Sequence, residues 1–539
     1  MNGTRIHLAA WLDLAVGIAV ALAAVKFAWG IALVVDLGLT DETTFYLLPG
    51  LRMLEGMRPD MEYGPLYSFW YAVLSRWQPD PLDLYYLNYF WMTVLPTPLL
   101  YASLRRWGTG RTASALFSVW FLLSQFNVQT WPKVSAFALV LLLVGIAIAP
   151  RRWELNAAFA AAISLVVAYV RPEFLLSFVL ACVWLAVGGW RHRAERNLHL
   201  KWIGVAVLGL LLALHATLGL PLSKGGRSWF AFQQHFAVNW VRWNSSHLNP
   251  WYDYKAVMLE AFGPVENLAA AAVANPGAMV RHAATNVQRG VVKTSNSLWP
   301  ERWMDARRGA IRIIAVGAAV ALLAWIGRRS SARRVPGPIR AEALILLAIY
   351  SVPGIVSALV FTPQDHYLLF PVVFGGMALM LNFVATSPES KGRLCLRTGF
   401  LCAAVILLVP GVARVSSAHQ DNVRTARFIR SLPLGGNLCL LEPEEGMWTY
   451  VGHQAAGVPW TAISADAGDF VQTKGINAVL VDAVALDIVA RKGGRAWEEF
   501  LACPLTEGFV RLDVPGTDRR LLIDRRLIDG AEETDGEIP

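Results

Sequence analysis

The chain has 539 residues, of which 55% are hydrophobic and 16% are charged, and its formal net charge is +9. Soluble domains usually carry about 25% charged residues, so the composition excludes an ordinary soluble protein over most of the length. Lys and Arg cluster between long apolar runs, which indicates membrane topology and argues against nucleic acid as a partner.

Apolar runs of about 20 residues cross a bilayer as helices. Such runs fill the chain up to residue 415, and we predict about eleven spans. The predicted fold class is therefore an α-helical polytopic membrane protein. The spans are expected at 11–35, 84–104, 112–126, 134–150, 157–170, 173–190, 202–220, 309–327, 341–361, 367–385 and 397–415.

The distribution of Lys and Arg predicts which side of the membrane each loop faces. Alternate short connections are strongly basic, at 105–111, 150–153, 190–201, 327–340 and 390–397. The intervening connections, 124–133, 170–173 and 362–366, hold at most one cation each. Because basic loops stay in the cytoplasm, we expect a cytoplasmic N-terminus and an extracytoplasmic C-terminus in a bacterial inner membrane.

Three regions outside the membrane then share the outer face. The loops 36–83 and 221–308 belong with the spans to a transmembrane module over residues 1–415. The tail from 416 to 530 alternates strand-like and helix-like runs, which predicts a small extracytoplasmic α/β domain. Its strand-like runs are Leu438–Leu441, Ala478–Val481 and Arg520–Ile523, and its helix-like runs are Asp421–Leu432 and Ala483–Lys492.

Two further features concern the tail. Residues 531–539 are acidic, and we expect them to be disordered. Cys439 and Cys503 both fall in the tail. They could form a disulfide in an extracytoplasmic domain, a question that the sequence leaves open.

The first outer loop carries two neighbouring carboxylates directly after the first span. Asp41 and Glu42 stand at the head of a helix-like run. A carboxylate at the membrane edge can take the proton from a hydroxyl that attacks a substrate carbon. The alternative is structural, with Thr40 as an N-cap and both carboxylates complementing the helix dipole.

A second acidic group follows in the phrase RPDMEYGPLY, which holds Asp60 and Glu62 ahead of Gly64 and Pro65. The Gly-Pro pair ends one segment and opens the next helix. Asp60 and Glu62 therefore belong either to a site or to a solvated turn.

These residues carry a resemblance to a known group of enzymes. Asp41 and Glu42, followed by LLPGLRMLEGMRPDMEYGPLYSFWYAVL, resemble the first outer loop of the GT-C integral-membrane glycosyltransferases. The subgroup is that of the protein O-mannosyltransferases and the lipid A aminoarabinose transferases, and VRPEFLLSFVL at 170–180 is similar to a later segment. The resemblance implies a polyprenyl-phosphate sugar donor, Asp41 as the catalytic base and Glu62 as a second acidic site residue, with Glu42 as a further candidate.

The second outer loop contains an aromatic stripe at helical spacing, formed by Trp229, Phe232, Phe236, Trp240 and Trp243. A helix with such a stripe next to a bilayer either floats in the interface and lines a groove for a polyprenyl chain, or packs as core under the tail domain. His235 lies beside the stripe. It is a candidate ligand for an acceptor or, as in some relatives, for a divalent metal ion, and the alternative is a structural histidine.

Departure of a lipid phosphate requires positive charge at the site. The outer-face candidates are Lys133, Arg171, Arg227, Arg302 and His366. His366 and Tyr367, ahead of Pro371, match a basic-Tyr-Pro phrase of the resembled group, although a histidine stands where relatives often have arginine. Snorkelling at the interface is the alternative for Lys133 and Arg171.

We therefore predict an inverting glycosyltransferase that moves a sugar from a polyprenyl-phosphate donor to a protein, lipid or glycan acceptor at the outer membrane face. Two alternatives are a transporter or flippase of lipid-linked sugars, and a polymerase or ligase of lipid-linked glycans. The transporter is disfavoured because the spans, apart from Lys26 and His215, lack the midplane charges that transporters carry.

Overall fold

The computed structural model describes residues 2–129, 132–150, 152–191, 198–219, 226–300, 337–381, 391–414, 420–452, 455–504 and 508–528. The chain divides into two compact units, each assembled from segments that are far apart in sequence. The first unit comprises Met1–Gly30, Asp60–Tyr67 and Tyr89–Ser417, and the second comprises Ile31–Pro59, Ser68–Asn88 and Ala418–Pro539. The described residues are mostly helical and include a five-stranded sheet.

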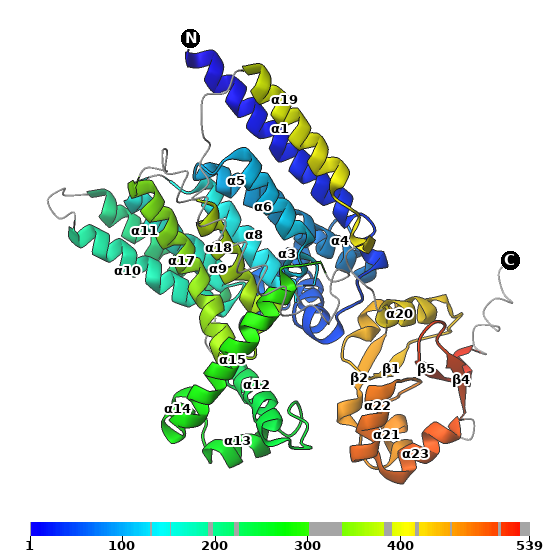
Figure 1. The fold of residues 1–539 in the computed structure, drawn as a ribbon. Helices are drawn as coiled ribbons and strands as arrows, with labels where there is room; N and C mark the ends of the chain where they lie inside the picture. The colour runs from blue at the N-terminus through cyan, green and yellow to red at the C-terminus, as the bar shows by residue number, and fades with distance from the viewer. Residues whose placement is uncertain are drawn as a thin grey trace. The chain divides into compact units, whose positions relative to one another are not determined.

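The first unit is built from helices that pack against neighbours in sequence and also against helices from distant parts of the chain (Figure 1). Its α-helices are α1 (Asn2–Ala28), α5 (Pro96–Arg106), α6 (Arg111–Leu123), α7 (Gln125–Val128), α8 (Val134–Ile148), α9 (Trp153–Ala168), α10 (Leu175–Arg191), α11 (Leu198–Leu218), α12 (Gly226–Asn244), α13 (Tyr254–Phe262), α14 (Leu268–Ala274), α15 (Pro276–Ser297), α17 (Gly337–Val360), α18 (Asp365–Met380) and α19 (Lys391–Leu408). The 3-10 turns η3 (Met61–Tyr63), η4 (Pro172–Phe174) and η7 (Val412–Arg414) connect them.

The predicted spans coincide with helices, with two exceptions. The range 84–104 is divided into α4 (Pro81–Val94) and α5, because Pro96 has no N–H for a continuous helix ladder. The range 309–327 lies outside the described residues. Two helices, Ala10–Leu33 and Arg340–Val360, meet the length and composition of a membrane span. Shorter apolar helices lie at Arg111–Leu123, Val134–Ile148, Trp153–Ala168, Pro172–Gly188, Gly204–Leu218, Asp365–Met380 and Cys395–Leu408.

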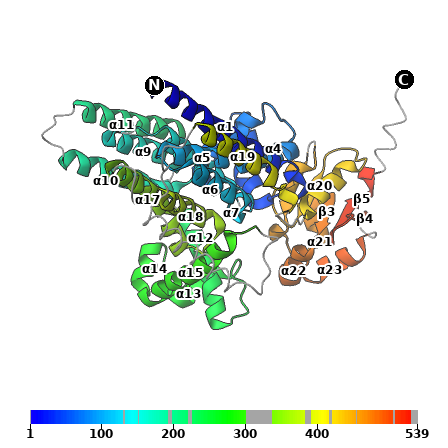
Figure 2. The same ribbon diagram turned by 45° about the horizontal axis from the view of Figure 1, so that its top comes forward.

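Helices α1 and α19 lie side by side although they come from distant parts of the chain (Figures 1 and 2). The Lys26 ammonium donates to the backbone carbonyl of Ile406 at 2.8 Å and to that of Leu407 at 3.4 Å. The charge inside the first predicted span therefore has structural partners on α19.

A second polar contact fixes α1 to the helices after it. The Asp13 carboxylate accepts from Arg105 Nη2 at 2.9 Å and also from Arg111. Arg105 lies in the last turn of α5 and Arg111 begins α6, so one carboxylate connects three helices.

The sheet of the second unit contains β1 (Cys439–Glu442), β2 (Ala456–Pro459), β3 (Ala478–Val481), β4 (Phe509–Asp513) and β5 (Arg520–Asp524). Their order is β2-β1-β3-β5-β4. Strand β1 is parallel to both of its neighbours, whereas β5 is antiparallel to β3 and β4. The sheet of the second unit is therefore mixed.

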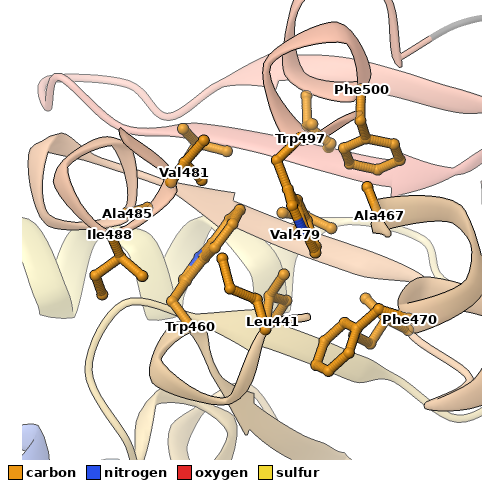
Figure 3. Packing of buried hydrophobic residues seen from close by; sticks show 14 of the residues in the cluster. Leu441, Trp460, Ala467, Phe470, Val479, Val481, Ala485, Ile488, Trp497 and Phe500 are labelled. Carbon is orange, nitrogen blue, oxygen red and sulfur yellow. The ribbon is translucent and has the colours of Figure 1, made fainter. Parts of the chain in front are cut away.

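Helices α20 (Asp421–Ser431), α21 (Ala467–Thr473), α22 (Ala483–Ile488) and α23 (Gly494–Ala502) complete the tail part of this unit. Trp460 and Trp497 are fully buried in its core, with ring centroids 5.1 Å apart (Figure 3). Both indole N–H groups donate to carbonyls, Trp460 to Leu480 at 2.9 Å and Trp497 to Ser464 at 2.7 Å. No disulfide joins Cys439 to Cys503, and residues 531–539 lie outside the described part of the chain.

The first outer loop and the residues that flank it contribute the remaining elements of the second unit. These are the 3-10 turn η1 (Ile31–Leu33), the π-helix η2 (Leu39–Leu47), α2 (Leu48–Met53), most of α3 (Pro65–Leu74) and most of α4. The segment that holds Asp41 and Glu42 is therefore part of the same compact unit as the tail.

Candidate functional site

Asp41 and Glu42 lie in the first turn of η2, and the structure separates their environments. The π-helix begins after Gly38, so Thr40 lies within it and is not its N-cap. Glu42 is fully buried, whereas Asp41 is exposed. Segments of π-helix are rare and occur frequently at functional sites.

The buried carboxylate is fixed by hydrogen bonds from helices α3 and α4. The Tyr71 hydroxyl donates to Glu42 Oε1 at 2.8 Å. Asn88 Nδ2 donates to the Tyr71 oxygen at 2.8 Å and lies 3.4 Å from the same Glu42 oxygen. The Asn88 carbonyl in turn accepts from Trp70 Nε1 at 2.9 Å. Glu42 is therefore the anchored carboxylate of the pair, and Asp41 is the one that faces outward.

A second buried carboxylate shapes the loop that follows β1. Glu442 is fully buried and accepts from the backbone N–H groups of Gly446 at 2.9 Å and Trp448 at 3.1 Å. Burial raises the pKa of Glu442 to about 7, although these N–H groups act to lower it. The loop 443–448 therefore folds around a carboxyl that titrates near neutral pH.

Glu442 makes the stability of the second unit depend on pH. Its pKa is raised in the folded state from 4.5 to about 7, so its contribution is complete below pH 4.5 and is lost as the pH rises through 7. The loss amounts to about 3 kcal/mol at 1.36 kcal/mol per pKa unit. In thermal unfolding of the full chain, Glu442→Gln should gain stability relative to the wild type between pH 5 and pH 8. Parallel pH curves for the two proteins would contradict this assignment.

In the first unit, Glu62 lies in η3, directly before the turn at Gly64. Asp60 caps this turn, because its Oδ1 accepts from the Glu62 N–H at 3.0 Å. The Glu62 Oε1 atom is buried and has no hydrogen-bond partner among the residues that the structure describes. A buried carboxylate oxygen is costly to leave unpaired, so this oxygen is suited to accept a hydrogen bond from a bound molecule.

Arg227 is the predicted cation that contacts the Glu62 segment. It begins α12, and its Nη1 donates to the Glu62 backbone carbonyl at 2.7 Å. Its guanidinium lies 4.2 Å from the centroid of the Tyr63 ring. Arg227 therefore fixes the backbone beside the buried Glu62 oxygen.

Arg171 and Lys133 lie in the interior of the first unit. Arg171 pairs with Glu173 at 2.5 Å, donates to the Ser135 hydroxyl, and contacts the His366 carbonyl at 3.3 Å. Lys133 is fully buried, and its ammonium donates to the Asn127 and Val128 carbonyls at 2.7 and 3.2 Å. Both side chains therefore bind partners inside the protein, and neither reaches toward the membrane interface as the snorkelling alternative expected. A phosphate would have to compete with them.

His366 and Tyr367 begin α18 and lie close to Arg171. The Arg171 guanidinium is 5.4 Å from the Tyr367 ring, and that ring stacks on Phe361 with centroids 5.6 Å apart. His366 and Tyr367 therefore form one cluster with Arg171. The predicted cation Arg302 lies outside the described residues.

The aromatic stripe on α12 forms a core, but its partners are helices α13 and α15 of the first unit and not the tail domain that the packing alternative named. Phe232 and Phe236 are buried against α13 and α15, with Trp229, Trp240 and Trp243 packed around them. The His235 ring lies 5.9 Å from Trp251 and 5.8 Å from Phe361. Burial, followed by the nearby His282 and Arg289, lowers the pKa of His235 to about 4. Its imidazole is therefore neutral at neutral pH.

A metal ion would need several ligands in one place. Among the residues that the structure describes, no group of three His, Cys, Asp or Glu side chains is arranged to hold one. We therefore derive no step through a metal.

Sequence reasoning did not find Tyr71, Asn88 or Tyr450. The first two lie 29 and 46 residues after Glu42, in apolar helices where a Tyr or Asn gives no periodic signal. Tyr450 is 407 residues from Thr43, whose hydroxyl it contacts. No local pattern identifies that contact.

No protein-family description matches the chain, and no curated protein matches it. Among solved structures, it is similar to ArnT from Cupriavidus metallidurans bound to undecaprenyl phosphate, with 12% identity, a TM-score of 0.37 and coverage of 96% of this chain and 98% of that one. It is also similar to the apo oligosaccharyltransferase of Archaeoglobus fulgidus, with 11% identity, a TM-score of 0.39 and coverage of 93% and 73%.

Proposed function

We propose that this chain is an integral membrane glycosyltransferase that moves a sugar from a polyprenyl-phosphate donor to an acceptor at the extracytoplasmic face, with inversion at the sugar carbon. The donor class and the inversion come from the sequence resemblance in the first outer loop. The support from the chain's own residues is an apolar exterior and a pair of carboxylates with different environments.

The apolar exterior favours a bilayer as the solvent. On α1, the side chains of Trp11, Leu14, Ile18 and Leu22 are exposed at helical spacing, and Trp29, directly after the helix, is 78% exposed. On α19, Phe400, Leu407 and Leu408 are each more than 70% exposed. Large contiguous apolar surfaces are rare on soluble proteins, so lipid is the solvent that suits these helices.

The observation that carries the proposal is that Glu42 is buried whereas its neighbour Asp41 is exposed. Glu42 is buried and hydrogen-bonded, which fixes the π-helix, and Asp41 is exposed one residue earlier. We assign Asp41 as the general base. Its carboxylate takes the acceptor's proton while the acceptor oxygen bonds to the sugar carbon, and the electron pair of the breaking C–O bond leaves with the lipid phosphate.

In the first unit, we assign the buried Glu62 oxygen to a substrate hydroxyl. Arg227 and the cluster of Arg171, His366 and Tyr367 are proposed substrate-binding groups. A lipid phosphate leaves without a general acid when fixed positive charge stabilises it, which suits arginines that are already held by neighbouring side chains.

A transporter of lipid-linked sugars fits these residues less well. Lys26, the charge within the first predicted span, is hydrogen-bonded to backbone carbonyls of α19. Intramembrane charges of transporters face a substrate pathway, whereas this one ties two helices together. A polymerase or ligase would use the same base and differ in the size of the donor.

The proposal is tested with membranes that contain the full chain, incubated with radiolabelled polyprenyl-phosphate sugars. Asp41→Asn should lower sugar transfer by about 10²–10⁴-fold, the range that general bases contribute. The matched control is Glu55→Gln, an exposed carboxylate of the same outer loop, which should transfer at the wild-type rate.

Insertion of both variants is checked by their yield in purified membranes. Wild-type transfer by an inserted Asp41→Asn variant would reject Asp41 as the base. Movement of label across sealed vesicles without cleavage of the sugar–phosphate bond would favour the transporter instead.

A further inference from the structure

The turn that follows β1 in the second unit contacts the chain's own outer loop. In open α/β sheets, ligands usually bind beyond the carboxyl ends of parallel strands, where connections leave the sheet in different directions. Strand β1 ends at Glu442, and the turn that follows reaches η8 (Met447–Tyr450). This turn contacts the π-helix η2 that carries Asp41.

Three contacts connect the turn to η2. The Thr43 and Tyr450 hydroxyl oxygens are 2.5 Å apart, and Thr44 Oγ1 donates to the Glu445 carbonyl at 3.1 Å. Gly446 lies so close to η2 that a Cβ built on it would be 3.0 Å from the Leu39 carbonyl oxygen. These contacts are made by residues on both sides of Asp41 in the sequence.

The number of hydrogens on each hydroxyl decides which group donates in the hydrogen bond between Thr43 and Tyr450. Thr43 Oγ1 donates its only hydrogen to the Gly38 carbonyl at 2.7 Å. The Tyr450 hydroxyl must then donate to Thr43. Burial raises the pKa of Tyr450 well above its usual value, which keeps that proton in place.

Tyr450 is itself held from several sides. It is fully buried, and its ring packs edge-on against Tyr85 with centroids 6.0 Å apart. Arg430 Nε donates to the Tyr450 carbonyl at 2.5 Å, and Arg430 also pairs with Asp80 at 2.9 Å. A side chain fixed in this way can define the position of the helix that it contacts.

The segment that leads into η2 is fixed to the tail because Asp36, in that segment, caps helix α20 of the tail. Helix α20 has no cap from its own N-cap residue, Gln420. Asp36 serves instead, because its carboxylate accepts from the N–H groups of Asn422 at 3.0 Å and Val423 at 2.9 Å. Asn422 Nδ2 also donates to the Leu37 carbonyl at 2.7 Å.

We propose that the C-terminal α/β domain is a positioning device for the Asp41–Glu42 segment and that Tyr450 is its principal positioning residue. The tail thereby holds a segment of this chain at the edge where open α/β sheets usually bind their ligands. The effect on turnover rests on the proposed function, but the effect on the position and order of η2 does not.

The test is Tyr450→Phe in the full chain, which removes the hydroxyl and keeps the ring against Tyr85. We expect faster hydrogen exchange of the amides at 39–47, and about a tenfold fall in kcat with the KM for the polyprenyl-phosphate sugar unchanged. Thr43→Val should loosen 39–47 at least as much, because it also removes the hydrogen bond to the Gly38 carbonyl. The double variant should be no worse than Thr43→Val, because the contact with Tyr450 is already lost in that single variant.

A matched pair of glycine variants gives an independent test. Gly446 and Gly475 both have positive φ, at +116° and +63°. A Cβ at Gly446 would meet Leu39, Thr43 and Thr44, whereas one at Gly475 would meet no atom within 4 Å. Gly446→Ala should therefore loosen 39–47, and Gly475→Ala should strain its own turn and leave that exchange unchanged.

Hydrogen exchange tests the positioning role and sugar transfer tests the proposed function, so the two can fail independently. Faster exchange of 39–47 in Tyr450→Phe, with no sugar transfer by the wild type, would support the positioning role and reject the reaction. Transfer by the wild type, with unchanged exchange and kcat in Tyr450→Phe, would overturn the positioning role and leave the reaction intact.

Discussion

Replacing Gly64 by alanine should prevent the first unit from folding stably. Gly64 has φ +76°, and a Cβ built on it would overlap the carbonyl group of the buried Val170. The left-handed conformation costs about 1–2 kcal/mol for a non-glycine residue, and forcing extra volume into a packed interior costs about 1–3 kcal/mol more. Because the obstructing atoms are backbone, neither side can move away cheaply.

The matched control is Gly56→Ala in the same outer loop. Gly56 has φ +87°, and a Cβ there would meet no atom within 4 Å. The Gly56→Ala variant should lose only the stability that the left-handed conformation costs, about 1–2 kcal/mol. Thermal unfolding of the two purified variants in detergent measures the difference. Equal melting temperatures would show that the approach of Gly64 to Val170 does not constrain the folded state.

Replacing Glu42 by alanine should destabilise the second unit by about 3 kcal/mol, the upper range for a buried hydrogen bond to a charged group. The Tyr71 hydroxyl would lose the carboxylate to which it donates at 2.8 Å, and a cavity would form at a fully buried position. Glu42→Gln keeps a carbonyl oxygen as acceptor and should retain most of the stability.

Asp41 provides the comparison for Glu42. Because it is exposed, Asp41→Asn should leave the melting temperature unchanged while it lowers sugar transfer. Glu42→Ala should lower the melting temperature. A wild-type melting temperature for Glu42→Ala, or a marked loss of stability for Asp41→Asn, would show that the roles of the two carboxylates are assigned in the wrong order.

The helices and the central strands could be predicted because each is encoded locally. The runs predicted at Leu438–Leu441, Ala478–Val481 and Arg520–Ile523 lie within one residue of β1, β3 and β5. Strand β2 was not predicted, because AGVP at 456–459 contains Gly and Pro and resembles a turn. Strand β4, at the other edge, was also missed.

The environments of the site residues could not be predicted, because tertiary contacts determine them. Asp41 and Glu42 are adjacent in the sequence, yet one is exposed and the other is fully buried. Lys133 follows a proline at an apparent membrane edge, and nothing local indicates that its ammonium is buried against two carbonyls. Arg171 did carry a signal, since Glu173 stands two residues later and forms its ion pair.

The long sequence separation between the acidic segment and its supports has a consequence for synthesis. Thr43 and Tyr450 are 407 residues apart, and ribosomes add about 5–20 residues per second. The acidic segment is therefore made roughly 20–80 s before the tyrosine that holds it. A nascent chain therefore carries its proposed base before it acquires the tyrosine that supports the base, so catalytic competence would have to wait until Tyr450 has been made.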